Sequence, residues 1–164
     1  MKNNILLFVF FITTFAACVR PPDYPIEPKI VFVSVTDKAG NKKSTILQDG
    51  IVSRDTMYLN FTFTDGDGDI GILNDSSLFI IDLRDSTREN AARGLPIVPE
   101  QGSKNGISGE MRIQIKGTCC HGIEFCQPSK IKPLDTVRYQ IYIKDRAGHE
   151  SNREKTDPIT VLCK

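Results

Sequence analysis

The stretch MYLNFTFT at residues 57–64 decides the fold class, because its apolar and polar residues alternate without a break. Successive side chains of a β-strand point to opposite faces, so this pattern predicts a strand with one dry and one wet face. The same alternation recurs at residues 110–116 and 137–144. A helical period of 3.6 residues hardly occurs after residue 29. The chain is therefore predicted to be all-β.

Other apolar runs supply further strands. Residues 30–35 and 78–83 are more continuously apolar, which predicts strands covered on both sides or lying near sheet centres, and residues 159–163 are predicted to form the last strand. Six or seven strands without real helices bury their apolar faces only against another sheet. We expect residues 29–164 to form one immunoglobulin-like antiparallel β-sandwich of about seven strands.

Two segments break this rhythm. Ser86 and Glu89 have capping-box spacing, and the residues up to Arg93 precede Gly94, which predicts a short helix. The chain from Leu95 to Gly109 contains two Pro and three Gly, which predicts a long surface loop.

The first 17 residues read as an export signal. Lys2 precedes an apolar run at residues 5–12, and small residues follow before a boundary. The run is too short to cross a bilayer, which takes about 20 apolar residues. Residues 15–18, Phe-Ala-Ala-Cys, resemble a bacterial lipobox, which implies that Cys18 carries acyl chains and anchors the protein to a membrane.

Residues 18–28 read as a tether, because four Pro within them resist helix and sheet. The whole chain has 21 basic and 20 acidic residues, and residues 1–17 contain one charge, so the processed chain is neutral. A nucleic-acid-binding protein needs a basic face, so this class is excluded. The predicted location is the cell envelope at the outer membrane, on its periplasmic or surface face.

An acidic loop, DGDGDIG at residues 65–71, follows the strand at 57–64. Like charges at alternate positions repel by roughly 1 kcal/mol per pair in water, and a hard cation with oxygen ligands removes this repulsion. The loop is not an EF-hand, because Ile70 and Ser76 stand where that motif has Gly and Glu. Asp65, Asp67 and Asp69 are predicted ligands of a structural Ca²⁺ ion.

A fourth ligand is expected from the loop after residues 137–144. In a Greek-key sandwich that loop lies at the same end as the acidic loop, and its first residue is Asp145. The alternative is that these aspartates form solvated Asp-Gly turns, which are common between strands.

The two segments FTFTDGDGDIG (61–71) and YIKDRAG (142–148) resemble a group of uncharacterised lipoproteins from Bacteroidota-type bacteria. The resemblance covers most of the processed chain. It implies an immunoglobulin-like domain on a lipid anchor and no enzymatic activity. The Asp-x-Ala-Gly pattern of such domains is usually followed by Asn, and this chain has His149 there, which weakens a ligand role for that position.

Four cysteines remain after Cys18, and an exported protein favours disulfides. Adjacent Cys119 and Cys120 are poor partners for each other, so one is expected to pair with Cys126 and the other with Cys163. The alternative is a zinc site that also uses His121, although the paired C-x₂-C spacing of strong zinc sites is missing. His121 and His149 are otherwise expected in exposed loops.

No nucleophile elbow, HExxH pair or phosphate-binding loop occurs in the chain. The expected function is therefore a non-catalytic envelope lipoprotein that acts as a binding or spacer module with an unidentified protein or glycan partner. Two alternatives are a small metal-dependent hydrolase and an accessory lipoprotein of a glycan-capture assembly. A glycan-capture protein needs an exposed aromatic platform, and Tyr58 and Tyr142 are the candidates for it.

Overall fold

The computed structural model describes residues 23–48, 55–71, 76–85, 89–97, 106–121 and 133–163. Every regular element within these ranges is a β-strand, which confirms the predicted all-β class. They contain no helix of the length and apolar character that a membrane span requires. The ten strands are β1 (Lys29–Thr36), β2 (Thr45–Gln48), β3 (Met57–Asp65), β4 (Leu78–Asp82), β5 (Glu89–Arg93), β6 (Ile107–Ile115), β7 (Leu134–Val137), β8 (Tyr139–Ile143), β9 (Glu154–Lys155) and β10 (Ile159–Cys163).

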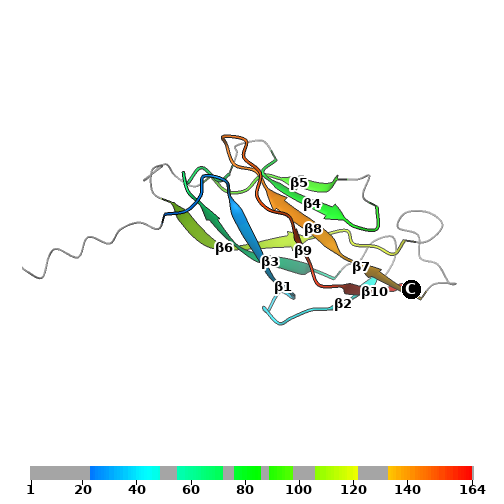
Figure 1. The fold of residues 1–164 in the computed structure, drawn as a ribbon. Helices are drawn as coiled ribbons and strands as arrows, with labels where there is room; N and C mark the ends of the chain where they lie inside the picture. Colours follow the sequence, from blue (N-terminus) through cyan, green and yellow to red (C-terminus); the bar gives the residue numbers. More distant parts are fainter. Residues whose placement is uncertain are drawn as a thin grey trace, which may run out of the picture.

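These strands form three sheets, with the orders β1-β3-β6, β5-β4-β8-β9 and β2-β10-β7 (Figure 1). The pair β10–β2 is parallel, and the other strand pairs are antiparallel. The number of strands exceeds the predicted seven partly because the run at 137–144 is divided at Arg138. The strand before Arg138 pairs with β10, whereas the strand after it pairs with β4. One continuous segment therefore joins two sheets.

In the central strand β3, the burial of the side chains alternates as its sequence predicts. Its odd-numbered residues are buried and its even-numbered residues are half-buried. Phe61 lies between Phe32 of β1 and Met111 of β6 across the sheet. The inward side chains of all three sheets contribute to one hydrophobic core, with Ile80 from β4 and Val161 from β10 among them.

Three predictions about local structure need correction. The residues expected to finish a short helix instead form strand β5 against β4, because a two-turn helix is too short to be stable alone and pairing extends the sheet; residues 86–88 lie outside the described ranges. Leu95, expected in a surface loop, is 3% exposed, and its N–H donates to Ser77 Oγ at 2.7 Å. Strand β1 is an edge strand rather than a covered one, and Val31 and Val33 are half-exposed.

A side chain replaces the missing neighbour at one point on the free edge of β1. Asn152 Oδ1 accepts a hydrogen bond from Ile30 N at 2.8 Å, and Asn152 Nδ2 donates to Ile30 O at 2.9 Å. This amide makes the same pair of bonds that a residue of a neighbouring strand would make. Asn152 thereby fixes the start of β1 to the chain that follows β8.

Candidate metal centre

Two strand ends bring the predicted ligands together. Asp65 is the last residue of β3, and Asp145 follows β8 by two residues. One carboxylate oxygen from each of four aspartates lies within 4.8 Å of the others; these are Asp65, Asp67, Asp69 and Asp145. This group, here the acidic cluster, could hold a metal ion. The prediction that the two loops lie at the same end of the fold is confirmed.

The first loop is folded by its own carboxylate and by glycine. Asp65 Oδ2 accepts a hydrogen bond from Asp69 N at 2.9 Å, which turns the chain back on itself. Gly68 has a φ of 71°, a left-handed conformation that glycine adopts without steric cost. Ile70 is fully buried and anchors the end of the loop in the core. The aspartates between these points therefore face inward.

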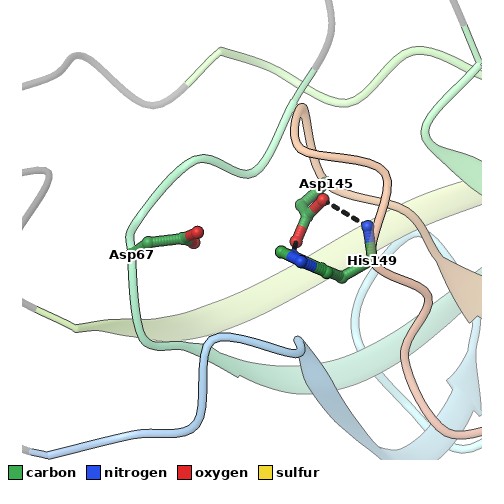
Figure 2. A group of neighbouring side chains, drawn as sticks. All are labelled: Asp67, Asp145 and His149. Carbon is green, nitrogen blue, oxygen red and sulfur yellow. Dashed lines mark hydrogen bonds and ion pairs between the residues drawn. The ribbon is translucent and has the colours of Figure 1, made fainter.

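The second loop is organised around Asp145. Its Oδ1 accepts hydrogen bonds from Gly148 N and His149 N, each at 2.7 Å. The two loops are joined directly, because Asp69 Oδ2 accepts a hydrogen bond from Ala147 N at 2.9 Å. Figure 2 shows the Asp67 carboxylate pointing across the gap toward Asp145 and His149.

His149, expected in an exposed loop, lies beside the acidic cluster. Its Nδ1 lies 2.9 Å from Asp145 Oδ2, and its side chain is 34% exposed. The hydrogen bond to Asp145, followed by the charge of that carboxylate, raises the pKa of His149. Asp67, Asp145 and His149 form a second, overlapping group that could hold a metal ion. The only signal of this contact in the sequence is spacing, because His149 follows Asp145 by four residues in the same loop.

The cluster contains oxygen atoms that receive no hydrogen bond. Asp65 and Asp145 are fully buried. Among the residues that the structure describes, Oδ1 of Asp65, Asp67 and Asp69 is buried without a hydrogen-bond partner. Burial, and then the charge of Asp67, raises the pKa of Asp65 to about 6. Burial, and then the charge of Asp145, raises the pKa of Asp69 as well. Three buried acceptors therefore lack a partner within a group of carboxylates that could hold a cation.

The described cysteines, Cys119, Cys120 and Cys163, lie at the other end of the domain. Cys120 forms a disulfide with Cys163, which selects one of the two pairings left open by the sequence. Cys119 is also disulfide-bonded, so neither sulfur is available for the alternative zinc site. Cys126 and the predicted lipid-bearing Cys18 lie outside the described residues. His121 is partly buried, and its backbone N–H donates a hydrogen bond to Asp135 Oδ2 at 2.8 Å.

A buried ion network supports this cysteine end. Arg84 Nη2 lies 2.5 Å from Asp82, and Arg84 Nη1 lies 2.7 Å from Asp135. The same Nη1 donates to Cys119 O at 2.9 Å. All three charged side chains are at most 13% exposed. Arg84 thus connects the turn after β4 to the segment that carries the disulfides.

The two tyrosines considered for an aromatic platform are both covered by arginine. The guanidinium carbon of Arg112 lies 4.1 Å from the ring centre of Tyr58, and that of Arg153 lies 4.0 Å from the ring centre of Tyr142. The other face of Tyr142 is not free, because Phe79 stacks on the ring at 4.6 Å. Tyr142 is 4% exposed as a result.

Comparison with known proteins adds no family to these observations: no family model, no curated protein and no solved structure matches the chain.

Proposed function

We propose that this protein is a non-catalytic lipoprotein of the cell envelope, whose immunoglobulin-like domain acts as a binding or spacer module and carries a structural Ca²⁺ ion in the acidic cluster. The observation that supports it most strongly is Asp65. This side chain is fully buried, yet its Oδ1 has no partner among the described residues and belongs to a cluster of four carboxylates. A buried charged oxygen is costly unless it is paired or coordinates a metal.

The donor set favours calcium among the common cations. All four ligand atoms are carboxylate oxygens, which hard cations prefer. Calcium binds oxygen at about 2.3–2.6 Å, so opposite ligands in its shell are about 5 Å apart. The four oxygens fit within such a shell, because none is more than 4.8 Å from another. Backbone carbonyls or water would complete the six to eight ligands that calcium takes.

A structural role agrees with the burial of the ligands. A catalytic metal needs an open coordination position beside a cleft. Asp65 and Asp145 are each 0% exposed, so an ion between them would be enclosed on that side by protein. This burial favours a stabilising ion over the alternative hydrolase. The covered rings of Tyr58 and Tyr142 likewise favour a spacer or protein-binding module over glycan capture.

The immunoglobulin-like assignment draws on strand order. Strand β3 lies between β1 and β6 in one sheet, while β4 pairs with β8 in another. The last strand, β10, pairs in parallel with the early strand β2 and antiparallel with β7. The inward side chains of these sheets meet in one core, as in a sandwich, and the parallel pair β2–β10 is the departure from the expected antiparallel arrangement.

Thermal unfolding with CaCl₂ or with chelator tests the calcium site. At a calcium concentration one hundred times Kd, binding adds about 2.7 kcal/mol, which corresponds to a rise in Tm of about 9 °C for a domain of this size. Asp67→Asn is expected to abolish the rise. Asp37→Asn is the matched control, because Asp37 is a turn aspartate outside the cluster and its replacement should leave the calcium response intact. An unchanged Tm in the unsubstituted protein refutes the calcium site.

The anchor is tested separately by cell fractionation. The wild-type protein should sediment with membranes, and a Cys18→Ala variant should be released into the soluble fraction. Membrane retention of this variant would refute the lipid anchor without bearing on the acidic cluster.

A further inference from the structure

A short segment that precedes β1 is packed against the acidic cluster. Residues 23–28 belong to the predicted tether, but Tyr24 is half-buried and Pro28 is buried. The carbonyl groups of Tyr24 and Pro25 lie directly over the backbone of Gly66, in the middle of the acidic loop. This end of the tether is therefore part of the domain surface.

The contact leaves no room for a side chain at position 66. A Cβ on Gly66 would lie 2.5 Å from Pro25 O and closer still to Tyr24 O, whereas real Cβ atoms stay beyond 3.0 Å. Gly66 is not among the glycines with positive φ. Its backbone conformation is thus open to any residue, and the requirement for glycine comes from the close approach of the two chain segments.

The start of β1, directly after this segment, is bonded to the chain that follows β8. Two residues after Pro28, the backbone N–H and C=O of Ile30 both form hydrogen bonds with the side-chain amide of Asn152. In Figure 2 the blue chain that leads into β1 runs below the loop that carries Asp67.

We propose that cation binding in the acidic cluster locks residues 23–28 onto the domain, so that this end works as a metal-dependent clamp on the chain entering β1. The inference rests on the proposed metal site. Without a cation, the carboxylates of Asp65, Asp67 and Asp69 repel one another and favour a more open loop. With a cation they converge, and the loop holds Gly66 in the position that receives the carbonyls of Tyr24 and Pro25.

Linkage makes this proposal quantitative. If the docked segment favours the metal-bound loop, then metal binding must favour the docked segment by the same factor. Hydrogen exchange of the full chain, measured by mass spectrometry with CaCl₂ or with chelator, follows the amides of Tyr24, Ile26 and Glu27. We expect calcium to slow their exchange on the order of tenfold.

The reciprocal experiment measures calcium affinity by calorimetry in Gly66→Ala. The new methyl group displaces the segment, so calcium binding should weaken on the order of tenfold and the segment should no longer be protected. Gly117→Ala is the matched control. It strains a glycine with a φ of 78°, but its Cβ meets nothing within 4 Å, and it lies beyond β6 at the opposite end of β3. Its calcium affinity should equal that of the wild type.

The outcomes separate the two proposals. If calcium does not bind the wild-type chain, the metal site itself is refuted and the clamp with it. If calcium binds and protects residues 65–71 while Tyr24, Ile26 and Glu27 exchange at an unchanged rate, the metal site stands and the clamp is wrong. Equal calcium affinities of Gly66→Ala and the wild type also overturn the clamp. Should Gly66→Ala fail to fold, the exchange of the wild-type segment still decides.

Discussion

Replacing Asp65 by Asn should stabilise the metal-free protein at neutral pH. In the folded state the pKa of Asp65 is about 6, against an ordinary value of 3.8, because the carboxylate is buried beside Asp67. Ionised Asp65 therefore costs the folded state about 3 kcal/mol at pH 7. An Asn removes this charge, and its Oδ1 can still accept the hydrogen bond from Asp69 N.

The sign of the effect depends on pH and on calcium. A folded-state pKa above the unfolded value means that this group favours folding at low pH and that the benefit is lost as pH rises through 6. Without metal, the Asn variant should exceed the wild type by up to about 3 kcal/mol at pH 7 and by almost nothing near pH 4. With saturating CaCl₂ the order should reverse, because only the wild type keeps all four carboxylates.

Urea unfolding at these two pH values, with chelator and with CaCl₂, gives the four free energies needed. Asp37→Asn serves as the control, because hydrogen bonds from Asn41 lower the pKa of Asp37 and its replacement should destabilise the protein in all conditions at neutral pH. If Asp65→Asn destabilises the metal-free protein at pH 7, the buried Asp65 carboxylate does not cost the folded state free energy. This result would contradict the proposed cation site.

Three other predictions concern the rest of the domain. Arg84→Met should destabilise the fold by about 3–5 kcal/mol in urea unfolding, because two buried carboxylates lose their partner; a loss below 1 kcal/mol would mean that the network is solvated. The double variant Cys120→Ala, Cys163→Ala opens a loop of 43 residues and should cost about 4 kcal/mol, seen as a fall in Tm of about 14 °C; an unchanged Tm would contradict this. Asn152→Ala removes two hydrogen bonds from Ile30 and should cost about 1–3 kcal/mol, with faster exchange of the Ile30 amide; protection equal to wild type would refute the pairing.

The strands with strict alternation could be predicted because their burial is one-sided. In strand β3, buried and half-buried side chains alternate residue by residue, as the alternation of its sequence predicts. The position of Asp145 followed from topology, since strands that run in the same direction end at the same edge of a fold. The sequence also contained enough to place Asp65, Asp67 and Asp69 in one loop.

Local signals failed where tertiary contacts outweighed them. The residues of β5 have good helix propensity and a capping spacing, yet the backbone pairs with β4. Strand β1 has a continuous apolar run that is typical of a covered strand, but Val31 and Val33 face solvent at a sheet edge. Propensity and hydrophobicity report what a segment tolerates, and the neighbours of that segment decide the outcome.

Contacts that involve only backbone were beyond the reach of pattern analysis. The packing of Tyr24 and Pro25 on Gly66 depends on two carbonyl groups and a missing side chain. A glycine between two aspartates reads as a turn residue, so nothing in the sequence separates this role from the ordinary one. The contribution of His149 was missed for a related reason: its hydrogen bond depends on the exact turn that Asp145 closes.

The paired hydrogen bonds from Asn152 to Ile30 bear on how the domain resists a pulling force. A force applied through the chain that precedes Asp23 first loads the contact of Tyr24 and Pro25 with Gly66, and then the first residue pair of β1 and β3. Asn152 grips the second residue of the strand, so it carries load almost from the beginning. The Cys120–Cys163 bridge lies outside this path and cannot delay the first rupture. Resistance to a force from this side should therefore depend first on contacts next to the acidic loops, whereas the Cys120–Cys163 bond holds the opposite end.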